Sequence, residues 1–390
     1  MKYNYNRQHI SPKDINSVIS ALKSERITQG KLVALFENKI KNYFGSKYSL
    51  VVSNATSAFY LLSQALKWKQ RDHIILSPLT FVAAANSVLK CNATPVFVDT
   101  RLSDQNLDPD LVEKKIKELK KKKKKVVAVV VTDYAGKPSE WKKFKKIRSK
   151  YNLKLVNDNC HALGAKYHST SKYAIKYADF VIQSYHAVKN ITTAEGGSIL
   201  TNDKKILDKL KILREHGFIK NNKKNPFNYN IKEVGFNFRL ADLNCALGIS
   251  QINRINLIRK QRDEMAKIYD KIFKNNKNII TPTRVKNKKS GYHLYNVRVK
   301  FDNLRLNKIN FYKILKKKYN INLQVHYTPT YMFDIYKKFI SRIDSFNNTE
   351  KYYNETFSLP LYIGLKKRDI ILIANKILSL IVKYSKINTI

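Results

Sequence analysis

The sequence predicts an α/β protein: a large domain with a mostly parallel sheet covered by helices, then a smaller C-terminal α+β domain. Short β-branched runs alternate with longer helical patterns between about residues 48 and 200, which is typical of such sheets. The 390 residues are enough for two hydrophobic cores, and 43% of them are hydrophobic. We place residues 1–250 in the large domain and residues 251–390 in the smaller one.

The predicted elements follow in order along the chain. Apolar, β-branched runs predict strands at 49–53, 73–77, 95–99, 126–132, 153–158 and 179–184. Helical periodicity predicts helices at 57–68, 81–90, 110–121 and 140–151. One long helical pattern, from about Leu240 to Phe273, leads out of the sheet domain. Strand patterns at 291–301 and 321–327, mixed with terminal helices, predict the smaller domain.

The chain is strongly basic, with 75 Lys and Arg against 29 Asp and Glu and a net charge of +46. This charge suits a protein that binds nucleic acid or an anionic surface without a cofactor, which is the alternative from a different class of function. The lysines are spread over the whole chain, however, and no nucleic-acid-binding motif accompanies them. The run Lys120–Lys125 joins a helix to the start of a strand, so we expect a solvated turn at the amino edge of the sheet.

Cysteine usage and hydropathy predict a cytoplasmic protein. Cys91, Cys160 and Cys245 have no C-x-x-C spacing, which favours neither a disulfide framework nor a metal site. The N-terminal segment lacks the apolar stretch of a signal peptide, and the apolar run 370–382 is interrupted by Asn375 and Lys376, so we expect no membrane span. The glycines form no G-x-G-x-x-G motif, which argues against a dinucleotide enzyme.

Candidate binding residues lie where the predicted strands end, at the edge where parallel sheets bind ligands. A helix that starts near Ser57 offers its backbone amides and the hydroxyls of Thr56 and Ser57 to a phosphate, although the same residues fit an ordinary cap. Asp158 ends a buried strand, where a carboxylate needs a cation such as a protonated pyridine nitrogen. An Asx turn or a helix cap explains Asp158 equally well. His161, three residues on, can reach the same ligand.

Lys189 follows the last of these strands, in a turn between Ser184 and paired glycines. Apolar and small neighbours destabilise an ammonium, which makes the amine available for a Schiff base. In so basic a chain a single lysine is weak evidence for a Schiff base, but the order in which Lys189 and the other candidate residues follow the strands is specific. A phosphate turn, a buried Asp and Ser-x(4)-Lys, each at a strand end, are what pyridoxal phosphate (PLP) requires of its enzyme. Phe81, after another strand end, either lies on the pyridine ring or joins the core.

As a set, these motifs resemble the DegT/DnrJ/EryC1/StrS family of sugar aminotransferases, which are fold-type I PLP enzymes. The resemblance extends over nearly the whole chain and rests on RITQGK, SNATSAF, PLTFVAAAN, PVFVD, DYAGKPSE, DNCHALGA, SYHAVKNITTAEGG, LREHG, GFNFRLADLNCALGISQI and QVHYTPTY. Within the family, SxHxxKxITTAEGG, DYAGK and QVHYxPxY are similar to the members that aminate C-4 of a UDP-4-keto-6-deoxy-N-acetylhexosamine in pseudaminic acid biosynthesis.

The resemblance implies a role for each matching residue. Lys189 forms the Schiff base, Asp158 pairs with the pyridine nitrogen, and His161 lies near the phenolic oxygen. Phe81 covers the ring, and the phosphate site comprises Ala55, Thr56, Ser57 and Ser184, with Asn237 from the neighbouring subunit of a homodimer. The nucleotide-sugar pocket comprises Tyr5, Glu25, Arg26, Ile27, Thr28, Gln324, Val325, His326 and Tyr327. Asn157 departs from the acidic residue of many relatives, which affects only the surroundings of Asp158.

The implied reaction transfers the amino group of L-glutamate to a ketosugar of the L-arabino configuration and gives UDP-4-amino-4,6-dideoxy-N-acetyl-β-L-altrosamine. Another nucleotide-linked ketosugar, such as the D-xylo epimer, is the alternative within the family. Related dehydratases carry a histidine in place of the Schiff-base lysine, so Lys189 argues against that activity.

Overall fold

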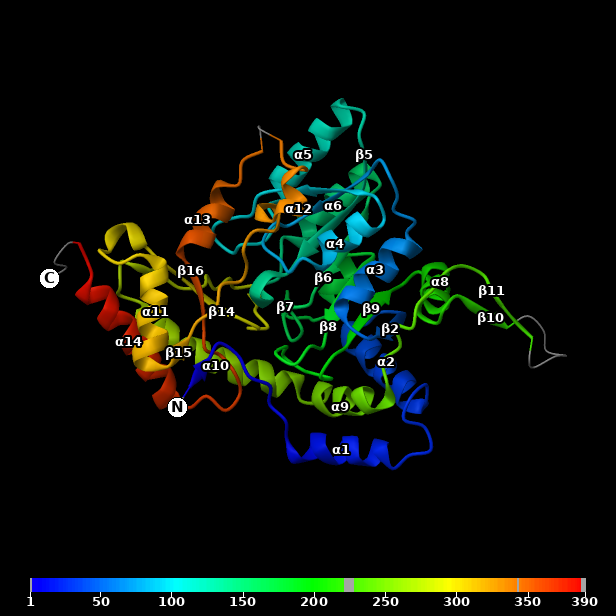
Figure 1. Cartoon of the computed structure of the whole chain (residues 1–390), viewed down its shortest axis with the longest axis horizontal. Coiled ribbons are helices and arrows are strands. Elements are labelled where there is room, and N and C mark those ends of the chain that lie inside the picture. The colour runs from blue at the N-terminus through cyan, green and yellow to red at the C-terminus, as the bar shows by residue number, and fades with distance from the viewer. Residues whose placement is uncertain (1, 221–227, 342–343, 387–390) are drawn as a thin grey trace.

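A seven-stranded sheet is the centre of the large domain in the computed structural model (Figure 1). The structure describes residues 2–220, 228–341 and 344–386. The strand order of the sheet is β2-β9-β8-β6-β5-β3-β4, and neighbours run parallel except at β9, which is antiparallel to both β2 and β8. The predicted mostly parallel sheet is confirmed, with β9 as an addition that the prediction lacked. The strands are β2 (Tyr48–Val52), β3 (Asp72–Leu76), β4 (Thr94–Phe97), β5 (Lys125–Thr132), β6 (Lys154–Asp158), β8 (Phe180–Ser184) and β9 (Gly197–Thr201).

Helices cover both faces of this sheet because successive strand residues point to opposite sides. Val51 and Val129 share a core with side chains of α2, α5, α6 and α7, whereas Leu50 and Val130 pack with α3, α4 and α8. The helices are α2 (Lys31–Phe44), α3 (Ala55–Ala65), α4 (Ala83–Lys90), α5 (Pro109–Lys121), α6 (Trp141–Tyr151), α7 (Tyr173–Tyr177) and α8 (Lys204–Arg214).

The single helix predicted from Leu240 to Phe273 is wrong, because two helices cover this segment. They are α9 (Asp242–Ile252) and α10 (Ile255–Phe273). At the break, Arg254 forms an ion pair with the buried Asp14 of α1 (Pro12–Leu22). The break lets α9 pack against α1 and α2 while α10 packs against α14 (Lys367–Lys383).

A second core surrounds a three-stranded antiparallel sheet of order β12-β14-β16 and includes side chains of α10, α11 and α14. Tyr3 belongs to this core because β1 pairs in parallel with β15, so the first residues pack with the last third of the chain. Of the strand predicted at 321–327, only β15 forms. The division at residue 250 stays a prediction. The elements are β1 (Tyr3–Asn4), β12 (Ile279–Ile280), β14 (Tyr295–Val299), η2 (Phe301–Asn303), α11 (Lys308–Tyr319), β15 (Ile321–Asn322), η3 (Thr330–Met332), α12 (Asp334–Lys337), α13 (Asn347–Glu355) and β16 (Thr356–Leu359).

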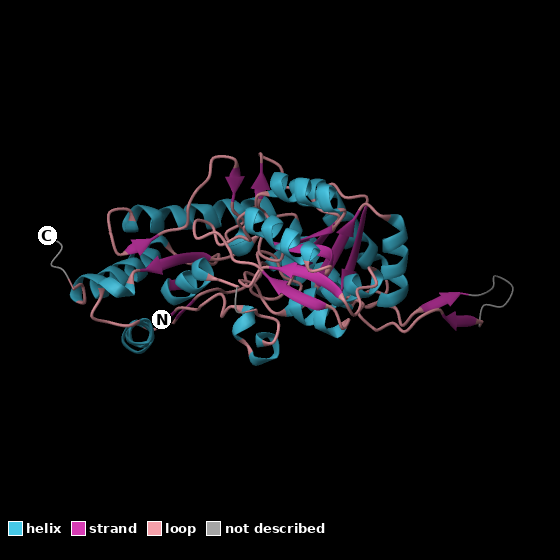
Figure 2. Ribbon diagram, turned by 90° about the horizontal axis from the view of Figure 1, so that it is seen from above, coloured by secondary structure: helices cyan, strands magenta, loops and turns pink. Residues whose placement is uncertain are grey.

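Two more pairs of short strands are antiparallel, and Tyr167 of one pair belongs to the core of the large sheet. β7 (Lys166–Tyr167) pairs with β13 (Lys288–Lys289), and β10 (Phe218–Lys220) with β11 (Tyr229–Ile231). Figure 2 shows β10 and β11 extending away from the rest of the chain. The predicted lysine turn is confirmed, since α5 ends at Lys121 and β5 starts at Lys125, at the amino edge of the sheet. Within the described residues, none of the helices has the length and apolar character needed to cross a bilayer.

Candidate active site

Lys189 lies in the turn that connects β8 to β9, just beyond the buried Ser184 at the end of β8. Part of its surface is accessible, but the surrounding protein desolvates the ammonium and lowers its pKa, while Cys160 and Asp158 act in the opposite direction. Its Nζ forms no hydrogen bond or ion pair with any residue that the structure describes. A lysine with a lowered pKa and no carboxylate partner is suited to act as a nucleophilic amine.

Two asparagine side chains hold this turn, and neither is among the predicted site residues. Asn190 donates from Nδ2 to the carbonyls of Leu163 and Gly291, both at 2.7 Å. Asn6 donates from Nδ2 to the carbonyl of Val188 at 2.7 Å. The backbone on both sides of Lys189 is therefore fixed by distant parts of the chain.

Asp158 ends β6 and is 4% exposed. Its Oδ2 accepts hydrogen bonds from the hydroxyls of Thr80 at 3.1 Å and Thr132 at 3.0 Å, and its Oδ1 accepts one from the Cys160 amide at 3.2 Å. No lysine, arginine or histidine of the described chain forms an ion pair with it. A buried carboxylate is stable only with compensation, so this one suits a ligand that brings a positive nitrogen.

His161 is buried, and both nitrogens of its ring have a hydrogen-bond partner. Its Nε2 lies 2.9 Å from the Tyr327 hydroxyl, and its Nδ1 accepts a hydrogen bond from the Ala135 amide at 3.4 Å. The ring of His293 lies 4.5 Å away, between centroids. Burial, followed by the positive charge of Lys189, holds the pKa of His161 well below its usual range, so the ring is neutral near pH 7.

Aromatic side chains from the N-terminal segment and from the loop after β15 lie beyond His161. His326 lies 4.9 Å from Tyr5, between ring centroids, and its Nδ1 lies 2.7 Å from the Ser358 hydroxyl. Burial, then the charge of Lys189, lowers the pKa of His326 to about 3. Phe81 is 59% exposed, and its ring lies 6.3 Å from that of Tyr327. An aromatic ring with a free face at this edge is suited to stack on a planar ligand.

The start of α3 corrects the prediction that the helix begins near Ser57. The helix begins at Ala55, and Asn54 is the N-cap. The Ser57 hydroxyl accepts from the Asn54 amide at 3.2 Å and donates to the Asn54 carbonyl at 2.7 Å, which makes it part of the cap. Ala55 and Thr56 are thus in the first turn, where backbone amides have no partner within the helix and can bind an anion. The Thr56 side chain is exposed.

Gly197 lets the start of β9 pass directly over this helix terminus. A Cβ there would lie 2.6 Å from the carbonyl carbon of Asn54 and 2.7 Å from the amide nitrogen of Ala55, closer than real Cβ atoms approach. The helix N-terminus, the end of β8 and the Lys189 turn consequently form one cradle. Its chemistry, with free amides beside hydroxyls, is that of a phosphate site.

We expect Gly197→Ala to lower PLP affinity at least about tenfold, because the new methyl displaces the first turn of α3 at an overpacking cost of about 1–3 kcal/mol. Titration of the cofactor-free protein with PLP measures the affinity. Gly364→Ala is the control: it has open space around it but a φ of +99°, so strain lowers the melting temperature and leaves PLP affinity unchanged. Equal affinity in wild type and Gly197→Ala would contradict the assignment of this cradle.

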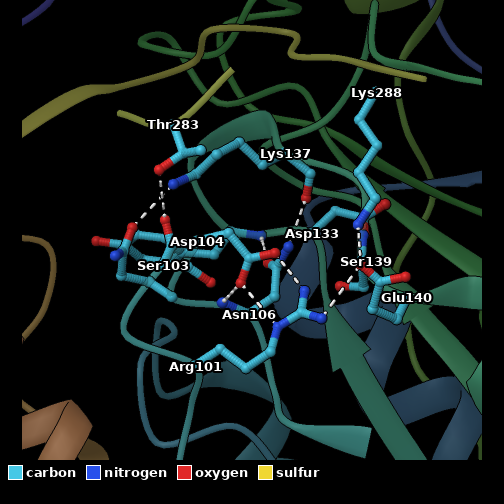
Figure 3. A network of polar contacts seen from close by, with 12 residues as sticks. Arg101, Ser103, Asp104, Asn106, Asp133, Lys137, Ser139, Glu140, Thr283 and Lys288 are labelled. Atoms are coloured by element: carbon cyan, nitrogen blue, oxygen red, sulfur yellow. Dashed lines mark hydrogen bonds and ion pairs between the residues drawn. The ribbon is translucent and has the colours of Figure 1, made fainter. Parts of the chain in front are cut away.

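A polar network supports the loop that contacts His161 (Figure 3). Asn106 accepts from the Tyr134 amide at 2.9 Å and donates to the Lys137 carbonyl at 3.0 Å, which holds η1 (Tyr134–Gly136) in place. Asp133 accepts hydrogen bonds from Ser139, Trp141, Asn159 and Tyr173, while burial raises its pKa to about 6. Arg101 and Lys288 both form ion pairs with the carboxylate of Glu140, at the edge of this network.

In the described chain, three groups of predicted residues form no hydrogen bond, ion pair or ring contact with Lys189 or His161. Glu25, Arg26, Ile27 and Thr28 are exposed between α1 and α2, where the Ile27 carbonyl accepts from the Asp242 amide at 3.0 Å. The exposed Asn237 forms a backbone bridge with Glu215. The side chain of Gln324 is exposed, and Val325 packs against the second core. Within the described chain these residues do not join the Lys189 cluster.

The chain matches the model of the DegT/DnrJ/EryC1/StrS aminotransferase family over residues 8–378. It belongs to this family. The resemblance drawn from the sequence motifs is therefore confirmed, and so are the aminotransferase class and the fold-type I architecture.

Individual DegT/DnrJ/EryC1/StrS proteins are similar to it over nearly their full length. The UDP-4-amino-4,6-dideoxy-N-acetyl-beta-L-altrosamine transaminase of Campylobacter jejuni is 36% identical, with 98% of both chains covered. The solved structure of Helicobacter pylori PseC, an aminotransferase involved in the biosynthesis of pseudoaminic acid, superposes with a TM-score of 0.90 and 32% identity, covering 98% of this chain and 100% of PseC. A putative sugar aminotransferase from Streptococcus pneumoniae, in its PLP form, has a TM-score of 0.88 at 24% identity, with 98% and 99% covered, and shows the common fold.

The described part of this DegT/DnrJ/EryC1/StrS chain fits PLP by its own chemistry. It offers the amine of Lys189 without a partner and the buried carboxylate of Asp158 without a cation. It also offers the exposed ring of Phe81 and the N-terminus of α3, beside which Gly197 leaves space. Sequence reasoning missed His293, which is 3% exposed and whose pKa burial holds well below its usual range. A histidine in the aromatic segment GYHLYN was the one available signal.

Proposed function

We propose that the protein is a PLP-dependent transaminase that moves the amino group of L-glutamate to C-4 of a UDP-4-keto-6-deoxy-N-acetylhexosamine. The product is UDP-4-amino-4,6-dideoxy-N-acetyl-β-L-altrosamine, for pseudaminic acid biosynthesis in the cytoplasm. The observation that carries the proposal is Lys189, an amine with a lowered pKa beside the unpaired Asp158. The names of the Campylobacter jejuni and Helicobacter pylori relatives support the choice of substrate.

The residues that would hold PLP surround Lys189. Asp158 would pair with the pyridine nitrogen, His161 would lie near the phenolic oxygen, and Phe81 would cover one ring face. The phosphate would lie against the amides of Ala55 and Thr56 and the hydroxyls of Thr56 and Ser184, with Asn237 of a second subunit. Ser57 would lie beside it, because its amide already donates to Oδ1 of Asn54 at 2.8 Å. When bound, PLP supplies an electron sink for the electrons left at the substrate carbon by proton removal.

Lys189 is the general acid and base of both half-reactions in this proposal. In the first half-reaction its Nζ would take the proton from the α-carbon of glutamate and pass it to the bound cofactor. In the second it would take a proton from the cofactor and deliver it to C-4 of the sugar. The lowered pKa favours the neutral amine, which is the form that accepts a proton. His161 and His326 stay neutral beside it and act as hydrogen-bonding partners.

The visible absorption spectrum tests the proposed function. The purified protein with PLP should show a band in the visible range that falls when L-glutamate is added and returns with 2-oxoglutarate. A colourless protein that does not respond to PLP and L-glutamate would overturn the proposal and favour a basic binding protein without a cofactor.

The pocket residues Tyr5, Glu25–Thr28 and Gln324–Tyr327 are proposed to select the L-arabino sugar, and we expect a higher kcat/KM for it than for the D-xylo epimer. A misplaced hydroxyl leaves buried polar groups without partners, which costs about 1–3 kcal/mol for each group. Competition between the two epimers with L-glutamate measures the ratio. A preference for the D-xylo epimer, or for a dTDP-linked sugar, would leave a family aminotransferase with the alternative substrate.

The active site is proposed to be shared between two subunits, because Asn237, Glu25 and Arg26 are exposed and form no hydrogen bond or ion pair with Lys189 in the described chain. We expect a mixture of Lys189→Ala and Asn237→Asp subunits to recover about a quarter of wild-type activity, since half of the dimers would carry one intact site. Each homodimer alone should be inactive, as the introduced carboxylate repels the phosphate. No recovery after unfolding and joint refolding would place Asn237 in the site of its own subunit.

A further inference from the structure

Two buried threonines, Thr80 and Thr132, both direct their hydroxyls at one oxygen of Asp158. Thr80 lies in the loop between β3 and α4 and is 6% exposed, while Thr132 is the last residue of β5 and is 2% exposed. Their hydroxyl oxygens lie 3.1 and 3.0 Å from Oδ2. Since an ionised carboxylate only accepts hydrogen bonds, both threonines are donors.

The two hydroxyl donors occupy acceptor positions on the Asp158 carboxylate, and these positions can be counted. An ionised carboxylate has about four acceptor positions, two on each oxygen. The two hydroxyls fill those of Oδ2, and the Cys160 amide takes one of Oδ1 at 3.2 Å. One position is left, and it is on Oδ1.

We infer that Thr80 and Thr132 are positioning residues, which fix the rotation of the Asp158 carboxylate so that Oδ1 alone faces the pyridine N–H of PLP. This inference rests on the proposed function. Thr80 has a second effect, because it precedes Phe81, whose ring is the exposed aromatic of the site. The hydrogen bond from Thr80 to Asp158 therefore fixes Asp158, which would lie in the plane of the cofactor ring, relative to Phe81, which would stack on that ring.

Removal of one hydroxyl should weaken cofactor chemistry without changing the fold. Valine has the shape of threonine but donates nothing, so Thr132→Val and Thr80→Val leave a position on Oδ2 unfilled in a buried site. Hydrogen bonds to charged groups are among the strong ones, so we expect about a tenfold rise in the Kd for PLP in either variant. The rate of the first turnover with L-glutamate should fall by about as much, with the KM for glutamate unchanged. Thr→Ser at either position keeps a hydroxyl and should restore both values to within about twofold.

A double-mutant cycle separates positioning from a purely structural role. If the threonines act through the charge of Asp158, Thr132→Val should change the PLP affinity and the glutamate rate less than about twofold once Asp158→Asn is present. Thr201→Val is the matched control: this threonine is 1% exposed at the far end of β9, and its hydroxyl donates to the Asp179 carbonyl at 3.2 Å. It should lower the melting temperature and leave PLP binding unchanged.

The outcomes distinguish this inference from the proposed function. A wild-type protein that binds PLP and responds to glutamate, with Thr80→Val and Thr132→Val variants that do the same equally well, would overturn the inference alone. An undiminished effect of Thr132→Val in the Asp158→Asn background, or a failure of serine to restore function in a protein that melts like wild type, would also overturn it. A wild-type protein that does not respond to PLP would overturn both.

Discussion

Lys189→Ala is expected to abolish transamination and to remove the covalent link that borohydride reduction leaves between protein and cofactor. The amine of Lys189 serves twice, as the anchor of PLP and as the group that moves the proton, so its loss should lower the rate roughly 10³-fold or more. Mass spectrometry of the reduced, digested protein locates the link, and single-turnover kinetics measure the rate.

Lys137→Met is the matched control for this experiment. Lys137 is a second lysine that follows a parallel strand, and burial lowers its pKa to about 8. Its Nζ, however, donates to Gln105 at 2.8 Å. The link should therefore remain in Lys137→Met at the peptide that contains residue 189. A link at any other lysine, or wild-type turnover by Lys189→Ala, would refute the role given to Lys189.

Asp158→Asn is expected to lower turnover by roughly three orders of magnitude while PLP still binds through its phosphate. An asparagine keeps the size of the side chain but brings no negative charge to hold a proton on the pyridine nitrogen, and electrostatic groups of this kind supply about 3–4 kcal/mol. The rate of α-proton exchange from L-glutamate measures the effect directly, because it does not depend on the sugar.

Asp179→Asn provides the comparison, since Asp179 is a carboxylate at the opposite edge of the sheet, where it pairs with Arg148 and accepts from the Leu155 amide at 2.9 Å. This change should lower the melting temperature and leave proton exchange intact. Proton exchange in Asp158→Asn at more than about a tenth of the wild-type rate would show that the buried charge is not the source of the activation.

The sequence predicted the site where its residues lie at the ends of successive strands. Lys189, Asp158, His161 and Ser184 each follow a recognisable strand, and the parallel sheet brings those ends together. The start of α3 was misplaced because serine is a common N-cap residue, whereas the backbone angles make Asn54 the N-cap. A cap is decided by the φ and ψ angles of one residue, which composition does not specify.

The supporting residues could not be predicted because they act across long separations. Thr80 and Thr132 lie 78 and 26 residues from Asp158, and Asn6 lies 182 residues from Val188. Thr132 belongs to a predicted strand, but nothing in the strand pattern connects its hydroxyl to Asp158. β9 was missed because its five residues begin with a glycine and a serine and are too short for a clear strand pattern. Its pairing with β2 and β8 makes it a strand.

The hydrogen bond from Asn6 to Val188 makes the N-terminal segment a reporter of cofactor binding. Thermodynamic linkage requires that a ligand which stabilises one arrangement of the Lys189 turn also stabilises whatever holds that turn. Tyr3 is in turn paired with Ile321, so opening of residues 3–6 releases contacts with the second core and with the Lys189 turn. Amide hydrogen exchange in these residues should therefore slow when PLP is added, far along the chain from the lysine that binds it.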